Sequence, residues 1–180
     1  MGCFNETAKQ CSERLGAHLT FGVADFRSLY QVEERFNIVI SCDNSLPHLL
    51  NDNDLHQALS NIWDKLICGG LFLASIRDYD QLLQERPRVT FPIVHDDDRG
   101  KRIVFQVWDW ENDNNTYTLE HFVIRKHGEE WRTSSRSTKY KAILRSELSR
   151  LLSETGFTDI IWHLPEETEY YQPVVTARRI

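Results

Sequence analysis

The sequence of 180 residues contains no long run of apolar residues, and no stretch approaches the roughly 20 residues that a bilayer-spanning helix needs. Its amino terminus also lacks the basic segment followed by apolar residues that marks a secretory signal peptide. We therefore expect a cytoplasmic protein with no membrane partner.

Clusters of basic residues are absent as well. The sequence has 21 Lys and Arg against 27 Asp and Glu, a net charge of −6 and a pI near 5.6. This balance gives no overall attraction for phosphate backbones or anionic membranes. Trp108, Trp110 and Trp131 lie on alternating segments, and the acidic neighbours Asp109 and Glu111 favour packing between sheets over stacking on nucleic-acid bases. We expect no nucleic-acid partner.

Cysteines are few, and no two of them form a Cys-x-x-Cys pair: Cys3, Cys11, Cys42 and Cys68. Their spacing argues against a zinc site and against a disulfide framework. We expect reduced thiols that are buried as small hydrophobic side chains. The segment His95–Asp98 has metal-capable groups, but it adjoins Arg99-Gly100 and is typical of a solvated hairpin turn. We expect no metal site there.

The composition is that of a globular protein. With 41% hydrophobic and 27% charged residues, the chain is long enough to bury one sizeable core. We expect a single domain over residues 1–180. The order of segments between Phe36 and Tyr79 gives the fold class, α/β.

A strand, a helix and a second strand follow one another in this stretch. The β-branched content of Phe36–Ser41 predicts a buried strand, and Asp52 is placed to cap a helix. Apolar residues of that helix recur at helical spacing: Leu55, Ala58, Leu59, Ile62, Trp63 and Leu66. Gly69-Gly70 is expected to end the helix and to lead into a parallel strand at Leu71–Ile76. The three elements predict a right-handed βαβ unit.

The polar segments after the two strands are the main functional clue. In an open α/β sheet, ligands bind beyond the carboxyl ends of parallel strands. Cys42–His48 follows the first strand and Ser75–Tyr79 follows the second. We therefore expect both segments to open onto one crevice.

The two ends of the chain predict further elements. Asn5–Leu15 has the spacing of a helix capped by Asn5, and Leu19–Ala24 is a short strand candidate. Near the carboxyl end, Ser146 is placed to cap a helix that ends at Gly156. Two last strands are expected at Phe157–His163 and Pro173–Ala177.

Between these parts the hydrophobic period changes from helical to alternating. Three alternating segments follow Arg86-Pro87, with turn residues at 98–100, 112–115 and 127–128: Arg102–Trp110, Thr116–Lys126 and Glu130–Tyr140. They predict an antiparallel meander. An insertion over residues 88–140 is too long for an ordinary connection, and insertions of that length are commonly functional covers.

Motifs at three places resemble those of the class I S-adenosylmethionine-dependent methyltransferases. The segments are SCDNSLPHL at 41–49, GGL at 69–71 and IRDYD at 76–80. The Gly-Gly-Leu step alone is weak, whereas Asn-Ser-x-x-His-Leu followed at fixed distance by Arg-x-Tyr-Asp is much stronger. The likeness is nearest to the glycine N-methyltransferase group and covers the chain from Asn5 onward. It implies a Rossmann-like sheet with a β-meander insertion.

The resemblance implies S-adenosyl-L-methionine as the cofactor. Asp25 resembles the residue that accepts a hydrogen bond from the adenine amino group, with Phe26 against the ring; alternatively, Asp25 caps its own turn. Cys42 and Asp43 lie where the family's backbone contacts the methionine end of the cofactor. His48 resembles a histidine of the cofactor pocket, or else it packs on the approach to the helix.

A small-molecule substrate is implied as the partner. The arginine of Arg-x-Tyr-Asp binds the substrate carboxylate in the glycine N-methyltransferase group, and Arg77 holds that position. The alternative for Arg77 is an ion pair with Asp78, Asp80 or an acid of the meander such as Glu120. Asn44 is a candidate substrate contact or an Asx turn. Tyr79 lines the same pocket or belongs to the core.

Two parts of the family pattern have no counterpart in this sequence. They are a first strand with its glycine-rich loop, and a second strand that ends in an acidic residue for the ribose hydroxyls. The sequence thus looks like a methyltransferase cut off at its amino end, with a partial sheet. In the family's sheet those strands lie between the strands expected at Leu19 and Phe36, so these two either pair directly or leave costly open edges.

Two functional hypotheses follow from the resemblance. The first is an enzyme that transfers a methyl group to a small molecule such as the amine of glycine, without a nucleophilic catalytic residue, because holding donor and acceptor close is the protein's main task. The second is a non-catalytic, truncated methyltransferase-fold protein without cofactor turnover. No Ser-His-Asp order, metal-ligand spacing or phosphate loop indicates another chemistry.

Overall fold

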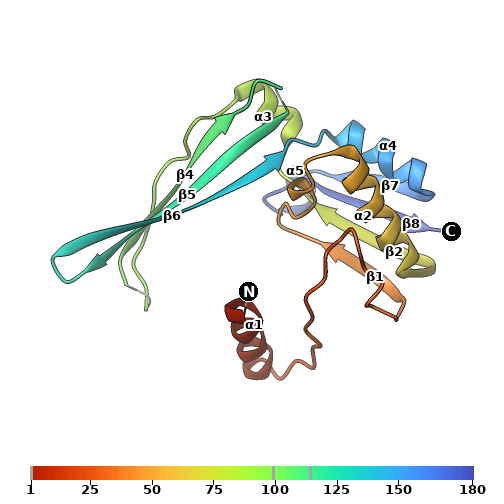
Figure 1. Cartoon of the computed structure of the whole chain (residues 1–180), viewed down its shortest axis with the longest axis horizontal. Helices are drawn as coiled ribbons and strands as arrows, with labels where there is room; N and C mark the ends of the chain where they lie inside the picture. The colour runs from red at the N-terminus through yellow and green to blue at the C-terminus, as the bar shows by residue number, and fades with distance from the viewer. Residues whose placement is uncertain (1, 99, 114) are drawn as a thin grey trace.

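The computed structural model describes residues 2–98, 100–113 and 115–180, with side chains from residue 8 onward. In chain order its elements are α1 Gly2–Arg14, β1 Phe36–Ser41, the 3-10 turn η1 Leu46–His48, α2 Asp52–Asp64, β2 Leu66–Ser75, α3 Tyr79–Glu85, β3 Ile93–His95, β4 Arg102–Trp110, β5 Thr116–His127, β6 Glu130–Lys141, α4 Arg145–Thr155, β7 Phe157–His163, α5 Pro165–Thr168 and β8 Val174–Arg179. The strands form two four-stranded sheets (Figure 1).

The first sheet contains the predicted βαβ unit. Its strand order is β1-β2-β8-β7, with β1 and β2 parallel and the other two pairs antiparallel. Helix α2 connects the two parallel strands and packs with α4 against one face of the sheet (Figure 1). The core between these layers is built from side chains that alternate on the strands, including Phe72, Ala74, Val175 and Ala177, which are all fully buried.

The predicted helix at α2 is confirmed, but its two ends differ from the prediction. Asn51 is the cap, because its side chain accepts from the Asp54 backbone N–H at 2.9 Å, and Asp52 is the first helical residue. The helix also ends earlier than expected. Leu66 already belongs to β2, so Gly69-Gly70 lies inside the strand, where the pairing with β1 shifts register. Gly69, with φ +78°, fits that irregular step.

Strand β1 has the predicted bounds, but it is not buried. Ile38 is 53% exposed and Ile40 61% exposed. β2 covers one edge of β1, and no described strand pairs with its other edge. The expected strand at Leu19–Ala24 does not form, because this segment finds no partner to complete its backbone hydrogen bonds.

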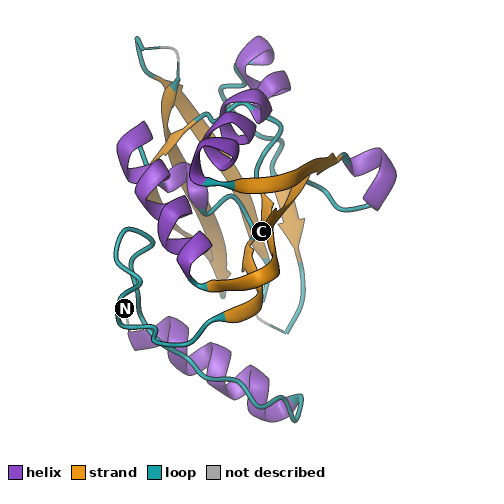
Figure 2. Cartoon of the chain, turned by 90° about the vertical axis from the view of Figure 1, so that its right-hand side faces the viewer, coloured by secondary structure: helices purple, strands orange, loops and turns teal. Residues whose placement is uncertain are grey.

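The amino-terminal helix lies apart from the sheets. Figure 2 shows α1 and the loop after it as an arm beneath the rest of the molecule. The helix begins at Gly2, so Asn5 lies within it and does not cap it. The prediction of buried thiols is wrong for Cys11, Cys42 and Cys68, which are all exposed. The Cys3 side chain lies outside the described part of the chain.

The alternating segments form a second, fully antiparallel sheet in the order β3-β4-β5-β6 (Figure 1). Strands β4, β5 and β6 match the predicted bounds to within one residue, and β3 is an addition. The turn predictions at Arg99 and at residue 114 lie outside the described residues. Lys141, at the end of β6, forms ion pairs with Asp52 and Glu147 and so ties this sheet to α2 and α4.

The carboxyl-terminal elements follow the prediction closely. Leu148, Leu151 and Leu152 of α4 are buried, and Gly156 ends the helix with φ 102°. Ser146 is not the cap, since the helix begins at Arg145 after Leu144. None of the described helices has the length and apolar character needed to cross a bilayer.

Candidate functional site

The loop after β1 has an unusual backbone conformation. Asp43 and Asn44 are both left-handed, with φ 57° and 61°. Asn and Asp tolerate this region better than other non-glycine residues, yet two in succession carry strain. Ser75, at the end of β2, holds them: its Oγ accepts from the Asp43 N–H at 2.9 Å and its carbonyl accepts from the Asn44 N–H at 3.1 Å. The two strand ends are thereby joined.

Asn44 and Arg77 meet directly, as the crevice prediction requires. The Arg77 backbone N–H donates to Asn44 Oδ1 at 3.1 Å. The Tyr79 hydroxyl donates to the same oxygen at 3.0 Å and lies 2.9 Å from the Tyr117 hydroxyl. Arg77 Nη1 donates to the Tyr117 hydroxyl at 2.8 Å. We call these four residues the buried network.

The guanidinium of Arg77 lies among aromatic rings. Its Cζ is 4.8 Å from the centroid of the Trp108 ring and 5.3 Å from that of Tyr140. The rings of Trp108 and Tyr117 stack in parallel, with centroids 4.7 Å apart. Tyr79 and Tyr117 are 0% exposed and Asn44 is 2% exposed.

No carboxylate among the described residues pairs with Arg77. The candidate acids Asp78 and Asp80 instead pair with Arg145, at 3.2 and 3.1 Å. The ion-pair alternative for Arg77 is therefore wrong for these two acids. Arg77 also lines an open cavity of about 340 Å³. A guanidinium in this setting is available to an anion.

Burial sets the protonation states of the network. It raises the pKa of Tyr79 well above 10, and it also raises the pKa of Tyr117. Burial alone would lower the pKa of Arg77, but the surrounding phenolic oxygens of Tyr117 and Tyr79 bring the net shift upward. At neutral pH both phenols are therefore protonated donors and Arg77 is a cation.

Three of the predicted cofactor residues lie together outside the buried network. Asp25, Phe26 and His48 line an open hollow of about 460 Å³ between the amino-terminal loop and the start of α2. The Phe26 carbonyl accepts from Asn61 Nδ2 at 2.9 Å, which fixes this loop to α2. We call this feature the open hollow.

The Asp25 carboxylate is occupied by Arg27. Asp25 Oδ1 accepts from the backbone N–H of Arg27 at 2.8 Å, and Oδ2 accepts from Arg27 Nη2 at 2.7 Å. These hydrogen bonds lower the pKa of Asp25 to about 2. The geometry is that of an Asx turn, the alternative considered for Asp25.

His48 connects the two features. Its ring lies 4.4 Å from the ring of Tyr140, which in turn covers Arg77. Contact with Tyr140 removes solvent from part of the His48 ring. This desolvation lowers the pKa of His48, and the positive charge of Arg77 lowers it further, although much of the ring remains open to solvent.

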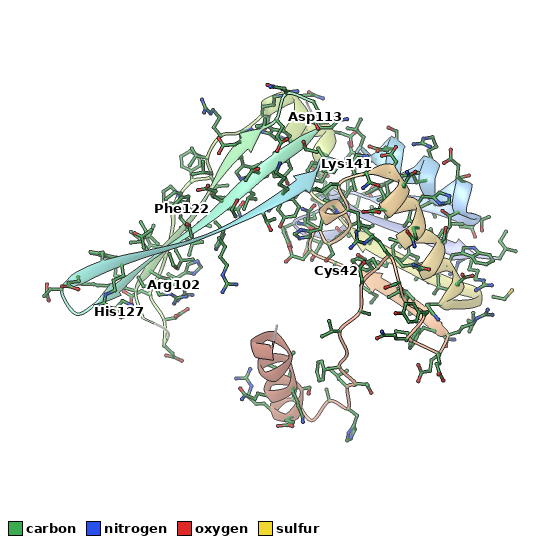
Figure 3. The ribbon with its side chains drawn as sticks, in the orientation of Figure 1. Cys42, Arg102, Asp113, Phe122, His127 and Lys141 are labelled. Carbon is green, nitrogen blue, oxygen red and sulfur yellow. The ribbon has the colours of Figure 1, made fainter. Side chains whose placement is uncertain are left out.

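Cys42 and Asp43 do not line the open hollow. Figure 3 shows Cys42 at the end of β1, on the side that faces the meander. Its side chain is exposed. Asp43 Oδ1 accepts from the Tyr171 hydroxyl at 2.5 Å, and this bond is the first cause that raises the pKa of Tyr171.

Sequence reasoning missed the aromatic residues of the second sheet that surround Arg77. Trp108 was assigned to packing between sheets, and Tyr117 and Tyr140 were not singled out. A cross-strand row, Trp110–Tyr117–Tyr140, places the last two beside each other. Alternation along the strands was visible in the sequence, but the register that aligns this row was not.

Comparisons with known proteins agree with this architecture. No family model matches the chain. The chain is 26% identical over 161 residues to a glycine/sarcosine N-methyltransferase from Aphanothece halophytica, covering 83% of this chain and 52% of that protein. It therefore spans about half the length of this curated relative.

Solved structures of methyltransferases superpose on most of the chain. DesVI from Streptomyces venezuelae has a TM-score of 0.74 at 17% identity, covering 96% of this chain and 70% of its own. An S-adenosylmethionine-dependent methyltransferase from Clostridium acetobutylicum has a TM-score of 0.73 at 16% identity, covering 95% and 68%. The resemblance drawn from the sequence is confirmed for the fold: the chain has the α/β fold of the class I S-adenosylmethionine-dependent methyltransferases.

Proposed function

We propose that this chain belongs to an enzyme that transfers a methyl group from S-adenosyl-L-methionine to a small substrate bearing a carboxylate, with the amine of glycine or a similar compound as acceptor. The observation that carries the proposal is Arg77. Its guanidinium is partly buried under Trp108 and Tyr140, next to Asn44, and it has no carboxylate partner among the described side chains, those of residues 8–98, 100–113 and 115–180.

Arg77 supports the carboxylate part of the proposal. A guanidinium offers five donors in a planar fork that matches a carboxylate, and only one bond, to Tyr117, is used by its side chain. The relative from Aphanothece halophytica is named for glycine and sarcosine. CalS10 from Micromonospora echinaspora is named as an amino pentose methyltransferase. Its solved structure has a TM-score of 0.68 at 13% identity, covering 87% of this chain and 63% of its own. A guanidinium without a carboxylate partner among the described side chains favours an amino acid over an amino sugar as the substrate.

The cofactor belongs at the strand ends. In this proposal, Asp25 and Phe26 receive the adenine, with His48 lining the same hollow, and the loop backbone at Cys42 and Asp43 meets the methionine end. S-adenosyl-L-methionine is already activated for in-line displacement at its methyl group. These residues therefore need only hold it close to the acceptor and exclude water.

The test is calorimetric titration of the full chain. S-adenosylmethionine and S-adenosylhomocysteine are each titrated into the chain, and glycine is then titrated into the complex with S-adenosylhomocysteine. We expect heat of binding in all three titrations. Arg77→Ala should weaken glycine binding by about 1.5–3 kcal/mol, the scale for hydrogen bonds to a charged group. Arg150→Ala, which changes an exposed arginine on α4, is the matched control. Equal glycine affinity in wild type and Arg77→Ala would refute the substrate class.

One observation favours a non-catalytic role as a second hypothesis. Both oxygens of Asp25 are already bound by Arg27, so the predicted adenine contact has a competitor within the chain. A protein of this kind would give no heat with either S-adenosylmethionine or S-adenosylhomocysteine. The Arg27→Ala variant separates the two hypotheses, because freeing Asp25 should strengthen cofactor binding only in the enzyme.

A further inference from the structure

The hydroxyl groups of the buried network have a fixed donor order. Arg77 Nη1 can only donate, so the Tyr117 oxygen accepts from it at 2.8 Å. The Tyr79 hydroxyl uses its single hydrogen on Asn44 Oδ1, at 3.0 Å. Across the 2.9 Å between the two phenols, Tyr117 must then be the donor and Tyr79 the acceptor. The chain of hydrogen bonds runs in one direction, from Arg77 to Asn44.

The same bonds determine which end of the Asn44 amide is free. The Arg77 backbone N–H cannot accept, so the atom that faces it at 3.1 Å must be the amide oxygen. This oxygen receives two donors, one from Arg77 and one from Tyr79, which fill its two lone pairs. Asn44 Nδ2 remains buried with no hydrogen-bond partner among the described residues.

A buried amide donor without a partner is costly, and a bound ligand that supplies an acceptor removes the cost. The amide therefore offers a ligand a donor and no acceptor. A carboxylate oxygen is an acceptor only, and it also suits the neighbouring guanidinium. Both groups thus select for the same ligand chemistry.

We propose that Tyr79 and Tyr117 are positioning residues whose hydroxyl groups lock the Asn44 amide, so that its NH2 group donates to a carboxylate oxygen of the substrate beside Arg77. This inference rests on the proposed function for its ligand, but not for the lock itself. Tyr79 thereby acts through Asn44. It does not line the substrate pocket, which was one of the two roles expected from the sequence.

The lock is tested first without ligand, by NMR of the side-chain amide of Asn44 in the full chain, with Asn44→Ser to assign its signals. In wild type the two NH2 protons should give separate signals that exchange slowly. Tyr79→Phe and Tyr117→Phe should each shift these signals and speed the rotation of the amide by tenfold or more. Tyr30→Phe is the matched control, because it removes one phenolic hydroxyl from a tyrosine that is 74% exposed and lies outside the network.

The second readout is glycine binding to the complex with S-adenosylhomocysteine. Tyr79→Phe and Tyr117→Phe should each weaken glycine about tenfold, and the double variant about as much as one alone, because the two hydroxyls are links of one chain. Tyr30→Phe, at an exposed tyrosine outside the network, should stay within twofold. Unchanged Asn44 signals in both variants, or losses that multiply in the double variant, would overturn the lock. If wild type binds no glycine but the amide signals respond as described, the lock stands and the proposed function alone fails.

Discussion

The buried network and the open hollow both place an arginine beside a polar side chain, and they do so in opposite ways. In the network, the guanidinium of Arg77 is held by three aromatic residues of the second sheet, so its side-chain partners are a neutral hydroxyl and rings. In the hollow, Arg27 pairs with Asp25 two residues away, and both side chains are about half exposed, at 48% and 46%.

This difference bears on what each region can do. Exposed ion pairs are screened by solvent and contribute little, so the Asp25–Arg27 pair is easily rearranged when a ligand arrives. A buried network with every hydroxyl satisfied is rigid, and it fixes the geometry of the groups that face a ligand. In the proposed enzyme, the rigid network would recognise the substrate, and the more easily rearranged hollow would receive the cofactor.

The largest expected effect comes from emptying the centre of the network. Tyr117→Ala should lower the free energy of unfolding by about 3–5 kcal/mol, the range for removing a large buried aromatic side chain, because Tyr117 is 0% exposed and stacks on Trp108. Urea unfolding followed by circular dichroism measures it. Tyr30→Ala, at a tyrosine that is 74% exposed, should change stability by no more than about 0.5 kcal/mol. Similar losses in the two variants would erase the contrast between interior and surface.

A smaller effect is expected from pH at the residue between the two regions. The folded state lowers the pKa of His48 below its ordinary value of 6.5, first by desolvation and then by the charge of Arg77. The unfolded chain therefore takes up a proton first, and stability should fall as the pH drops below 6.5 until the folded His48 also titrates. His48→Gln should flatten the stability profile in this window. An unchanged profile would disconnect His48 from Arg77.

The opposite end of the pH scale tests the tyrosines. Burial raises the pKa of Tyr79 and Tyr117 above 10, so their contribution to stability is complete below that pH. Stability should fall as the pH rises above 10, because the unfolded phenols ionise first. The fall should be shallower in Tyr117→Phe, as measured by urea midpoints at increasing pH. Equal slopes in the two proteins would mean that Tyr117 is not buried.

The smallest effect is expected in the open hollow. Asp25→Asn should leave the urea midpoint unchanged, and raising the salt concentration should not separate the variant from wild type, because both side chains of this ion pair are about half exposed and solvent screens their attraction. A clear loss of stability in low salt would show that the hollow is held by this pair.

Elements with a strong local pattern were predictable from the sequence. The stripe of Leu55, Ala58, Leu59 and Ile62 identified α2, and alternation identified β4 to β6, because both signals come from side chains near in sequence. The strand predicted at Leu19–Ala24 was wrong because a strand depends on residues distant in sequence. A strand exists only with a partner, and the local apolar content of this segment supplies none.

The site was predictable in part. The meeting of Asn44 and Arg77 followed from the rule that parallel strands end at one edge of a sheet. The contribution of Tyr117 and Tyr140 depends on how the second sheet packs on the first. The orientation of the Asn44 amide depends on four hydrogen bonds among residues of the loop after β1, the loop after β2, α3 and β5. Neither can be obtained from spacing along the chain.

The central claim is that the Arg77 guanidinium and the Asn44 amide form one site for a carboxylate. A crystal structure of the full chain with S-adenosylhomocysteine and glycine tests this claim most directly. We expect one glycine carboxylate oxygen within hydrogen-bond distance of the Arg77 guanidinium and the other within hydrogen-bond distance of Asn44 Nδ2, with Tyr79 still donating to Asn44 Oδ1. Glycine bound away from Arg77, or Arg77 paired with an acidic side chain of the protein, would contradict it.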